Sequence, residues 1–215
     1  SSTNEVRMEE KLKLYLEQHI INMYQQFDMA HKKSHVYKVI ENALSIATDY
    51  DVDMDMVYVI ACYHDIGMKF GRKDHHITGG QFLFDDIFLE SYFNEKSRIT
   101  MKEAIEDHRA SRETPPRSIY GKIIAEADRD IDPNTIILRT VQFGFKHYPN
   151  ISEEQHIQRA YDHITEKYGP NGYLKLWLDT KKNQEGLNKI HELLLKKDTL
   201  YAIIKQHYDN LQTKS

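Results

Sequence analysis

The chain has 215 residues and a net charge of −4, and 40% of its residues are hydrophobic. This composition is typical of a soluble globular protein, and the charge excludes the broad basic surface that nucleic acid or anionic lipid attracts. No apolar stretch approaches the length of a membrane span. The single cysteine, Cys62, excludes an internal disulfide and is typical of a core residue in a reducing compartment. With no basic-then-apolar leader in the sequence, we expect a cytoplasmic protein that binds neither a membrane nor a nucleic acid polymer.

Helical periodicity dominates the first part of the chain. We expect a helix over 5–30 whose apolar side is formed by Val6, Leu12, Leu14, Leu16, Ile20 and Ile21. A second helix, over about 35–50, is expected to begin after an N-cap at Ser34. The segment 54–67 is apolar on nearly all sides, which predicts a central buried helix that ends at Gly67.

The rest of the chain is also expected to be helical. We predict helices that start at Ile77, that span 98–111, and that span 118–131 and stop before Pro133. Residues 134–215 are predicted to be helical with one break at 168–172. The sequence therefore predicts an all-α single domain over 1–215, with a core at roughly 30–132 and a C-terminal helical extension over 133–215. The amphipathic stretch 196–211 is a candidate subunit contact, so a homodimer is one of the expected states.

Histidines and aspartates recur at predicted helix ends and on apolar helices. They are His35, His64, Asp65, His75, His76, His108 and Asp128. Imidazole nitrogens and carboxylate oxygens that converge from several rigid elements are what a metal centre needs. Neighbours on a helix point about 100° apart, so the His64–Asp65 doublet shares one metal only from a helix end or a distorted turn. Alternatively, Asp65 bridges two metals. A structural ion pair is a weaker interpretation, because adjacent residues pair poorly.

In the order in which they occur, these residues resemble the HD superfamily of metal-dependent phosphohydrolases. The phrases SHVYKV, YHDIG and AEADRD are similar to its first, second and last motifs. HHITGGQFL and EDHRASRETPPRSIYGKIIAEADRDID are closer still to a group of uncharacterised bacterial HD-domain hydrolases. The resemblance covers roughly residues 30–132, and an ordered set of positions is far more specific than a lone doublet.

The resemblance implies a ligand set for one or two divalent ions. His35, His64, Asp65 and Asp128 would bind the first ion, and His108 with bridging Asp65 and His75 or His76 would bind the second. His75 matches the family's histidine four residues before a small pair, here Gly79–Gly80, and His76 is then a neighbouring or substrate-contacting residue. The nitrogen and oxygen ligands suit Mn²⁺, Fe²⁺, Mg²⁺, Co²⁺ or Zn²⁺.

Such ions clamp a phosphoryl group and activate water for attack, so we expect hydrolysis of a small phosphorylated molecule, with a nucleotide among the candidates. Asp65 and Arg109 are the predicted catalytic residues. Lys69, Arg72, Arg112 and Arg129 are predicted to bind the substrate, and Asp107 or Asp130 is a candidate to orient a ligand imidazole. The chain lacks the further histidine beside His108 that some cyclic-dinucleotide-cleaving relatives carry, which disfavours that activity.

Two other functions fit the same residues. The ligand set resembles the di-iron site of HD-fold oxygenases such as myo-inositol oxygenase, and identical ligands can serve redox chemistry when iron is bound. A non-catalytic sensor that binds metal or nucleotide and signals through its C-terminal helices is the other alternative.

Overall fold

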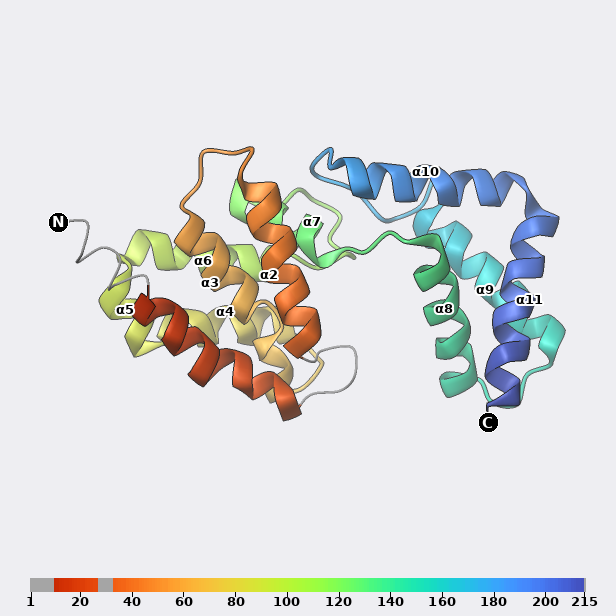
Figure 1. Cartoon of the computed structure of the whole chain (residues 1–215), viewed down its shortest axis with the longest axis horizontal. Coiled ribbons are helices and arrows are strands. Elements are labelled where there is room, and N and C mark those ends of the chain that lie inside the picture. The colour runs from red at the N-terminus through yellow and green to blue at the C-terminus, as the bar shows by residue number, and fades with distance from the viewer. Residues whose placement is uncertain (1–9, 27–32, 215) are drawn as a thin grey trace. The chain divides into compact units, whose positions relative to one another are not determined.

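The computed structural model describes residues 10–26 and 33–214 of the chain, and their regular elements are all helical (Figure 1). This confirms the all-α prediction. The chain forms two compact units, which divide between Arg129 and Asp130. The expected boundary between core and extension, after residue 132, lies close to this division. That the two units form a single domain stays a prediction. No described helix combines the length and apolar character that crossing a bilayer requires.

The N-terminal unit holds the segments that carry the histidines and aspartates. Its elements after the first segment are α2 (Lys33–Ala47), α3 (Met54–Tyr63), η4 (Ile66–Phe70), α4 (His75–Asp85), α5 (Ile87–Tyr92), α6 (Glu95–Asp107) and α7 (Ile119–Asp128). The predicted helix at 35–50 begins earlier, so Ser34 lies within its first turn. Helix α2 buries apolar residues that recur at helical spacing, among them Val36, Val39 and Ala43.

The first segment is not one regular helix. Residues 10–15 are α-helical and continue into a π-helical stretch, η1 (Leu16–Ile20), and a 3₁₀ helix, η2 (Ile21–Gln26). Val6, predicted to face the core, lies outside the described residues. Leu14 is exposed, contrary to the prediction, because it lies two positions from the buried Leu12 and Leu16, and a turn of about 100° per residue places it on the opposite side of the helix. Tyr24 in η2 is fully buried instead.

Helix α3 is the buried centre of this unit. It begins at Asp53, whose side chain accepts hydrogen bonds from the backbone N–H groups of Asp55 and Met56. The helix ends at Tyr63 rather than at Gly67, so the predicted end is wrong. Gly67 instead lies inside η4, in close contact with α4: a Cβ at this position would collide with the His75 carbonyl oxygen and the Gly79 nitrogen.

The predicted end of the helix at 118–131 is also displaced. Helix α7 ends at Asp128, and Arg129 is extended. Pro133 does not halt this helix but opens the next one, because proline fits the first helical position, where its missing N–H is not needed. The Asp132 side chain caps that helix by accepting a hydrogen bond from the Thr135 N–H.

The C-terminal unit consists of α8 (Pro133–His147), α9 (Glu153–Tyr168), α10 (Lys181–Leu195) and α11 (Lys197–Thr213). Its core is formed by residues that include Ile137, Ile164 and Ile204. The chain leaves helical structure between α8 and α9 and throughout 169–180, so the single predicted break at 168–172 was too short. A capping box at Ser152 and Gln155 starts α9.

Candidate metal centre

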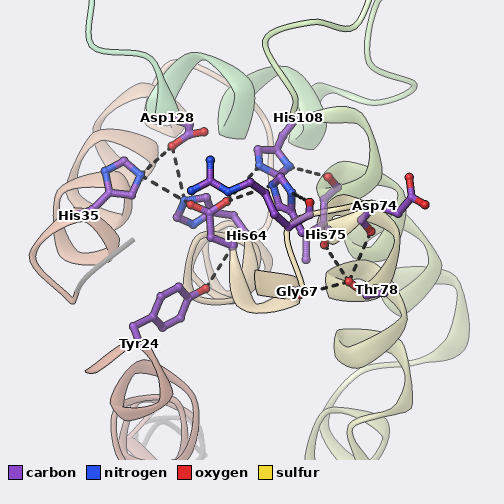
Figure 2. Close-up of polar contacts among 12 residues, drawn as sticks. Tyr24, His35, His64, Gly67, Asp74, His75, Thr78, His108 and Asp128 are labelled. Carbon is purple, nitrogen blue, oxygen red and sulfur yellow. Dashed lines mark hydrogen bonds and ion pairs between the residues drawn. The ribbon is translucent and has the colours of Figure 1, made fainter. Parts of the chain in front are cut away.

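Six of the seven predicted metal ligands converge in the N-terminal unit (Figure 2). His35 comes from the first turn of α2, His64 and Asp65 follow the end of α3, and His75 begins α4. His108 follows α6 and Asp128 ends α7. Their ligand atoms form two groups, and within each group all these atoms lie within 4.8 Å of one another.

The first group contains His35, His64, Asp65 and Asp128. Asp128 Oδ1 lies 2.9 Å from His35 Nε2 and 3.5 Å from His64 Nε2. Asp65 Oδ2 lies 3.2 Å from His64 Nε2 and 3.9 Å from His35 Nε2. Two imidazole nitrogens thus face one oxygen from each of two carboxylates.

The second group contains Asp65, His75 and His108. Here the other oxygen of the same carboxylate is used: Asp65 Oδ1 lies 3.8 Å from His75 Nε2 and 3.7 Å from His108 Nε2. Asp65 therefore presents Oδ2 to the first group and Oδ1 to the second. A carboxylate that bridged two cations would need this arrangement.

Backbone carbonyls orient three of the histidines. The Nδ1 atom lies 2.7 Å from the Ala61 oxygen in His64, 3.0 Å from the Arg72 oxygen in His75, and 2.5 Å from the Ile105 oxygen in His108. A carbonyl only accepts, so Nδ1 carries the proton in each ring. In the neutral form of each ring, Nε2 then carries no proton and faces the carboxylates, which is the tautomer that a metal ligand requires.

The doublet occupies the helix end that its geometry demands. His64 is the C-cap of α3, and Asp65 departs from helical geometry at φ −114°. The last carbonyls of a helix have no intrahelical N–H partner, so the Ala61 oxygen is available to the His64 ring. Adjacent residues can serve as ligands to one site only where the chain departs from a regular helix, and here it does so between α3 and η4.

Burial and charge in this cluster are unusual. Burial lowers the pKa of His64, but the carboxylates of Asp65 and Asp128 outweigh it and raise this pKa well above its ordinary value. Burial raises the pKa of Asp65, but the His64 and His108 imidazoles hold it well below its usual range. The two ionised carboxylates are therefore stabilised by positive charge placed beside them.

His64 Nε2 is buried and makes no hydrogen bond with any described residue. It lies instead within ion-pair distance of Asp65 and Asp128, and buried charges crowded in this way are costly unless a partner neutralises them. The donor set of nitrogen and oxygen atoms without thiolate fits a borderline or hard divalent ion. The residues therefore fit the metal that the HD resemblance implies.

His76 belongs to neither group. It is buried on α4, and its pKa is lowered by burial and by the nearby Arg109 guanidinium. The structure brings His75, and not His76, to the carboxylate of Asp65.

The predicted cations have different surroundings. Arg109 is exposed and directly follows His108. Its positive charge is near enough to His76 to lower the pKa of that imidazole. Lys69 Nζ lies 5.8 Å and 5.7 Å from the ring centroids of Phe70 and Phe82. Arg72 supplies the carbonyl that orients His75, and Arg129 follows Asp128 with a partly buried side chain. Their predicted roles toward substrate stay predictions.

Asp107 does not orient an imidazole. Its buried carboxylate accepts hydrogen bonds from the Arg117 backbone N–H at 2.8 Å and from the Arg117 guanidinium, and it pairs with Arg112 at 3.1 Å. These contacts fix the loop between α6 and α7, which carries Arg109. The role predicted for Asp107 or Asp130, to orient a ligand imidazole, is filled by backbone carbonyls for His64, His75 and His108.

Sequence reasoning missed Tyr24. Its hydroxyl donates to the Cys62 carbonyl at 2.8 Å and accepts from the Asp65 N–H at 3.2 Å. The only signal in the sequence was an aromatic residue near the end of the first helical segment, and that signal does not say what the hydroxyl contacts.

Comparison with protein families gives one match for this chain. A model of the HD domain matches residues 33–130. A crystal structure described as a predicted HD superfamily hydrolase, from an uncultured Thermotogales bacterium, is similar with 24% sequence identity and a TM-score of 0.47. That similarity covers 72% of this chain and 85% of the other. No curated protein matches the chain.

The matched segment begins with α2 and ends two residues after Asp128, so it contains all six grouped residues. An HD domain with a cluster of histidines and aspartates able to hold metal indicates, in general terms, a metal-dependent hydrolase. Residues 33–130 are an HD domain, and they contain all six of the grouped histidines and aspartates.

Proposed function

We propose that this protein is a metal-dependent phosphohydrolase that cleaves a small phosphorylated molecule, with nucleotides among the candidate substrates. The observation that carries the proposal is the position of Asp65, whose two oxygens face two separate groups of ligand atoms. A pair of cations held by one carboxylate is suited to a phosphoryl group, which has several oxygens to bind.

In this proposal His35, His64, Asp65 and Asp128 hold one divalent cation, and Asp65, His75 and His108 hold the other. When bound, the cations supply Lewis-acid stabilisation of the phosphoryl charge and activate a water molecule for in-line attack.

The protein's own residues supply orientation and charge. Carbonyl oxygens lock the rings of His64, His75 and His108 with Nε2 toward the carboxylates. The doublet is almost fully buried, so its charges act in a medium less polar than water, where they are stronger. The ligand geometry is therefore set before substrate arrives, which lowers the cost of reorganisation.

Arg109 is the proposed phosphate-binding residue at the entrance. It is exposed, adjacent to His108, and carried on a loop that Asp107 and Arg117 fix. A guanidinium binds two phosphate oxygens at once, which a lysine does not do as well. Lys69, Arg72, Arg112 and Arg129 are the further candidates. Arg112 already pairs with Asp107, so it has less freedom to reach substrate.

The test is elemental analysis of protein purified without chelator, followed by a panel of phosphomonoesters, nucleotides and cyclic nucleotides assayed with the metal found. We expect phosphate release from part of the panel, its loss in Asp65→Asn, and at least a tenfold fall in kcat/KM in Arg109→Ala.

Failure to release phosphate from any compound would contradict the proposal. A mixed-valent iron EPR signal that responds to a non-phosphorylated substrate would favour the oxygenase instead. Tight nucleotide binding without turnover would favour the sensor.

A further inference from the structure

We propose that Tyr24 is a positioning residue that holds Asp65 in its bridging orientation. The inference rests on the metal centre of the proposed function and adds to it a residue from outside the ligand set. Tyr24 lies in η2, more than 40 positions before the doublet, and Figure 2 shows its hydroxyl directed at the doublet.

The Tyr24 hydroxyl makes two hydrogen bonds with the backbone around His64. It donates to the Cys62 carbonyl oxygen at 2.8 Å, and it accepts from the Asp65 N–H at 3.2 Å. Cys62 precedes the doublet and Asp65 ends it, so one oxygen atom spans the point where the chain leaves α3.

This point is where the backbone must be controlled. His64 is still helical, whereas Asp65 has φ −114° and ψ 10°. A rotation about these bonds would carry the carboxylate away from one of the two ligand groups, because its oxygens lie 3.2 Å from His64 on one side and 3.7 Å from His108 on the other. Holding the Asp65 N–H restrains that rotation.

Tyrosine is suited to this position. A hydroxyl donates and accepts at once, and the ring is completely buried, so water does not compete for either bond. Burial and the Asp65 carboxylate raise the pKa of Tyr24 well above its ordinary value. The phenol stays protonated and serves as a structural donor and acceptor rather than as an acid or base.

The test compares Tyr24→Phe with Tyr63→Phe. Both changes remove one hydroxyl from a fully buried ring, but the Tyr63 hydroxyl donates to Asp86 and not to the doublet backbone. Each full-length protein is stripped of metal and titrated with Mn²⁺, and bound ion is followed by EPR. We expect Tyr24→Phe to bind Mn²⁺ about 10- to 100-fold more weakly and to lose the exchange-coupled spectrum of a bridged pair. Tyr63→Phe should match wild type.

The shift of Tm on adding Mn²⁺ is a second measurement that remains valid for a less stable variant. It should be smaller in Tyr24→Phe than in the other two proteins. Wild-type affinity and a wild-type coupled spectrum in Tyr24→Phe would overturn the inference while leaving the proposed function intact. Equal losses in both variants would overturn it too, by showing general destabilisation. Absence of Mn²⁺ binding by wild type would overturn the metal centre itself.

Discussion

The Asp65 carboxylate is the residue on which the two ligand groups depend. Its Oδ2 lies near His64 and His35, and its Oδ1 lies near His75 and His108. In the proposed two-cation centre, sharing one carboxylate would reduce the number of negative charges that must be buried and would hold the two cations close despite their repulsion. Because both groups share this carboxylate, a substitution of Asp65 should affect metal binding in both.

Substitutions in the two groups should change metal stoichiometry differently. Asp65→Asn keeps the size of the side chain but removes the charge shared by both groups, so we expect both ions to be lost. His75→Ala leaves the first group whole, so we expect one ion per chain to remain. Elemental analysis after purification without chelator measures both results.

His76→Ala is the matched control for His75→Ala. His76 neighbours His75 but belongs to neither group, so the variant should retain the wild-type metal content. Loss of an ion in His76→Ala, with none in His75→Ala, would reverse the assignment of the two histidines.

His156 in the C-terminal unit should make stability depend on pH. It is buried and packs against the rings of Phe145 and Tyr208, whose centroids lie 5.1 Å and 5.5 Å from its own. Burial and the Arg159 charge lower its pKa. The unfolded chain therefore takes up a proton near pH 6.5, before the folded one does, and stability falls as the pH drops below that value.

Replacing this imidazole with phenyl should weaken that dependence. We expect the loss in free energy of unfolding between pH 8 and pH 5.5 to be smaller in His156→Phe than in wild type, because phenyl takes up no proton. Urea denaturation of both proteins with EDTA present measures the difference, and EDTA removes metal release as a cause. An unchanged pH dependence would show that His156 titrates alike in both states.

At the scale of elements, the approach of η4 to α4 sets the position of His75. Gly67 lies so close to α4 that a Cβ would collide with the His75 carbonyl oxygen. The Thr78 hydroxyl donates to the Gly67 carbonyl at 3.4 Å. The glycine is there for space, since its backbone does not need a left-handed conformation: among the described glycines only Gly71 has positive φ.

Gly67→Ala should therefore separate the two elements. Overpacking of this kind costs about 1–3 kcal/mol, and the displaced His75 should weaken Mn²⁺ binding in the second group. Gly79→Ala is the milder comparison, because its Cβ would lie 3.2 Å from the nearest atom, the Gly67 nitrogen. We expect the free energy of unfolding, measured by urea denaturation, and the affinity for Mn²⁺ both to decrease from wild type to Gly79→Ala to Gly67→Ala. Equal decreases in the two variants would contradict this explanation.

The whole molecule consists of two compact units, and the proposed metal centre lies within one of them. A ligand that binds only the native state stabilises it by about 2.7 kcal/mol at 100 times its Kd. If the chain is a single domain, as the sequence predicts, calorimetry should show one unfolding transition whose Tm rises with Mn²⁺. Two transitions, of which Mn²⁺ moves only one, would show that the units are separate domains.

Much of the helical arrangement followed from the sequence because amphipathic periodicity depends on neighbouring residues. The apolar face of α2 and the buried character of α3 were predicted on that basis. Helix ends were predicted less well. The end of α3 at Tyr63 depends on the backbone turn at Asp65, and the role of Pro133 depends on the Asp132 side chain, which caps α8.

The sequence by itself determined the HD domain and predicted the candidate ligands, because the order and chemistry of His35, His64–Asp65, His108 and Asp128 can be recognised without knowing any distance. Only the tertiary structure decided that His75 rather than His76 reaches Asp65, that carbonyl oxygens orient three of the rings, and that the Tyr24 hydroxyl hydrogen-bonds the Asp65 N–H. These contacts are set by a few ångströms between atoms and by the register of helices distant in the chain, which local residue patterns do not encode.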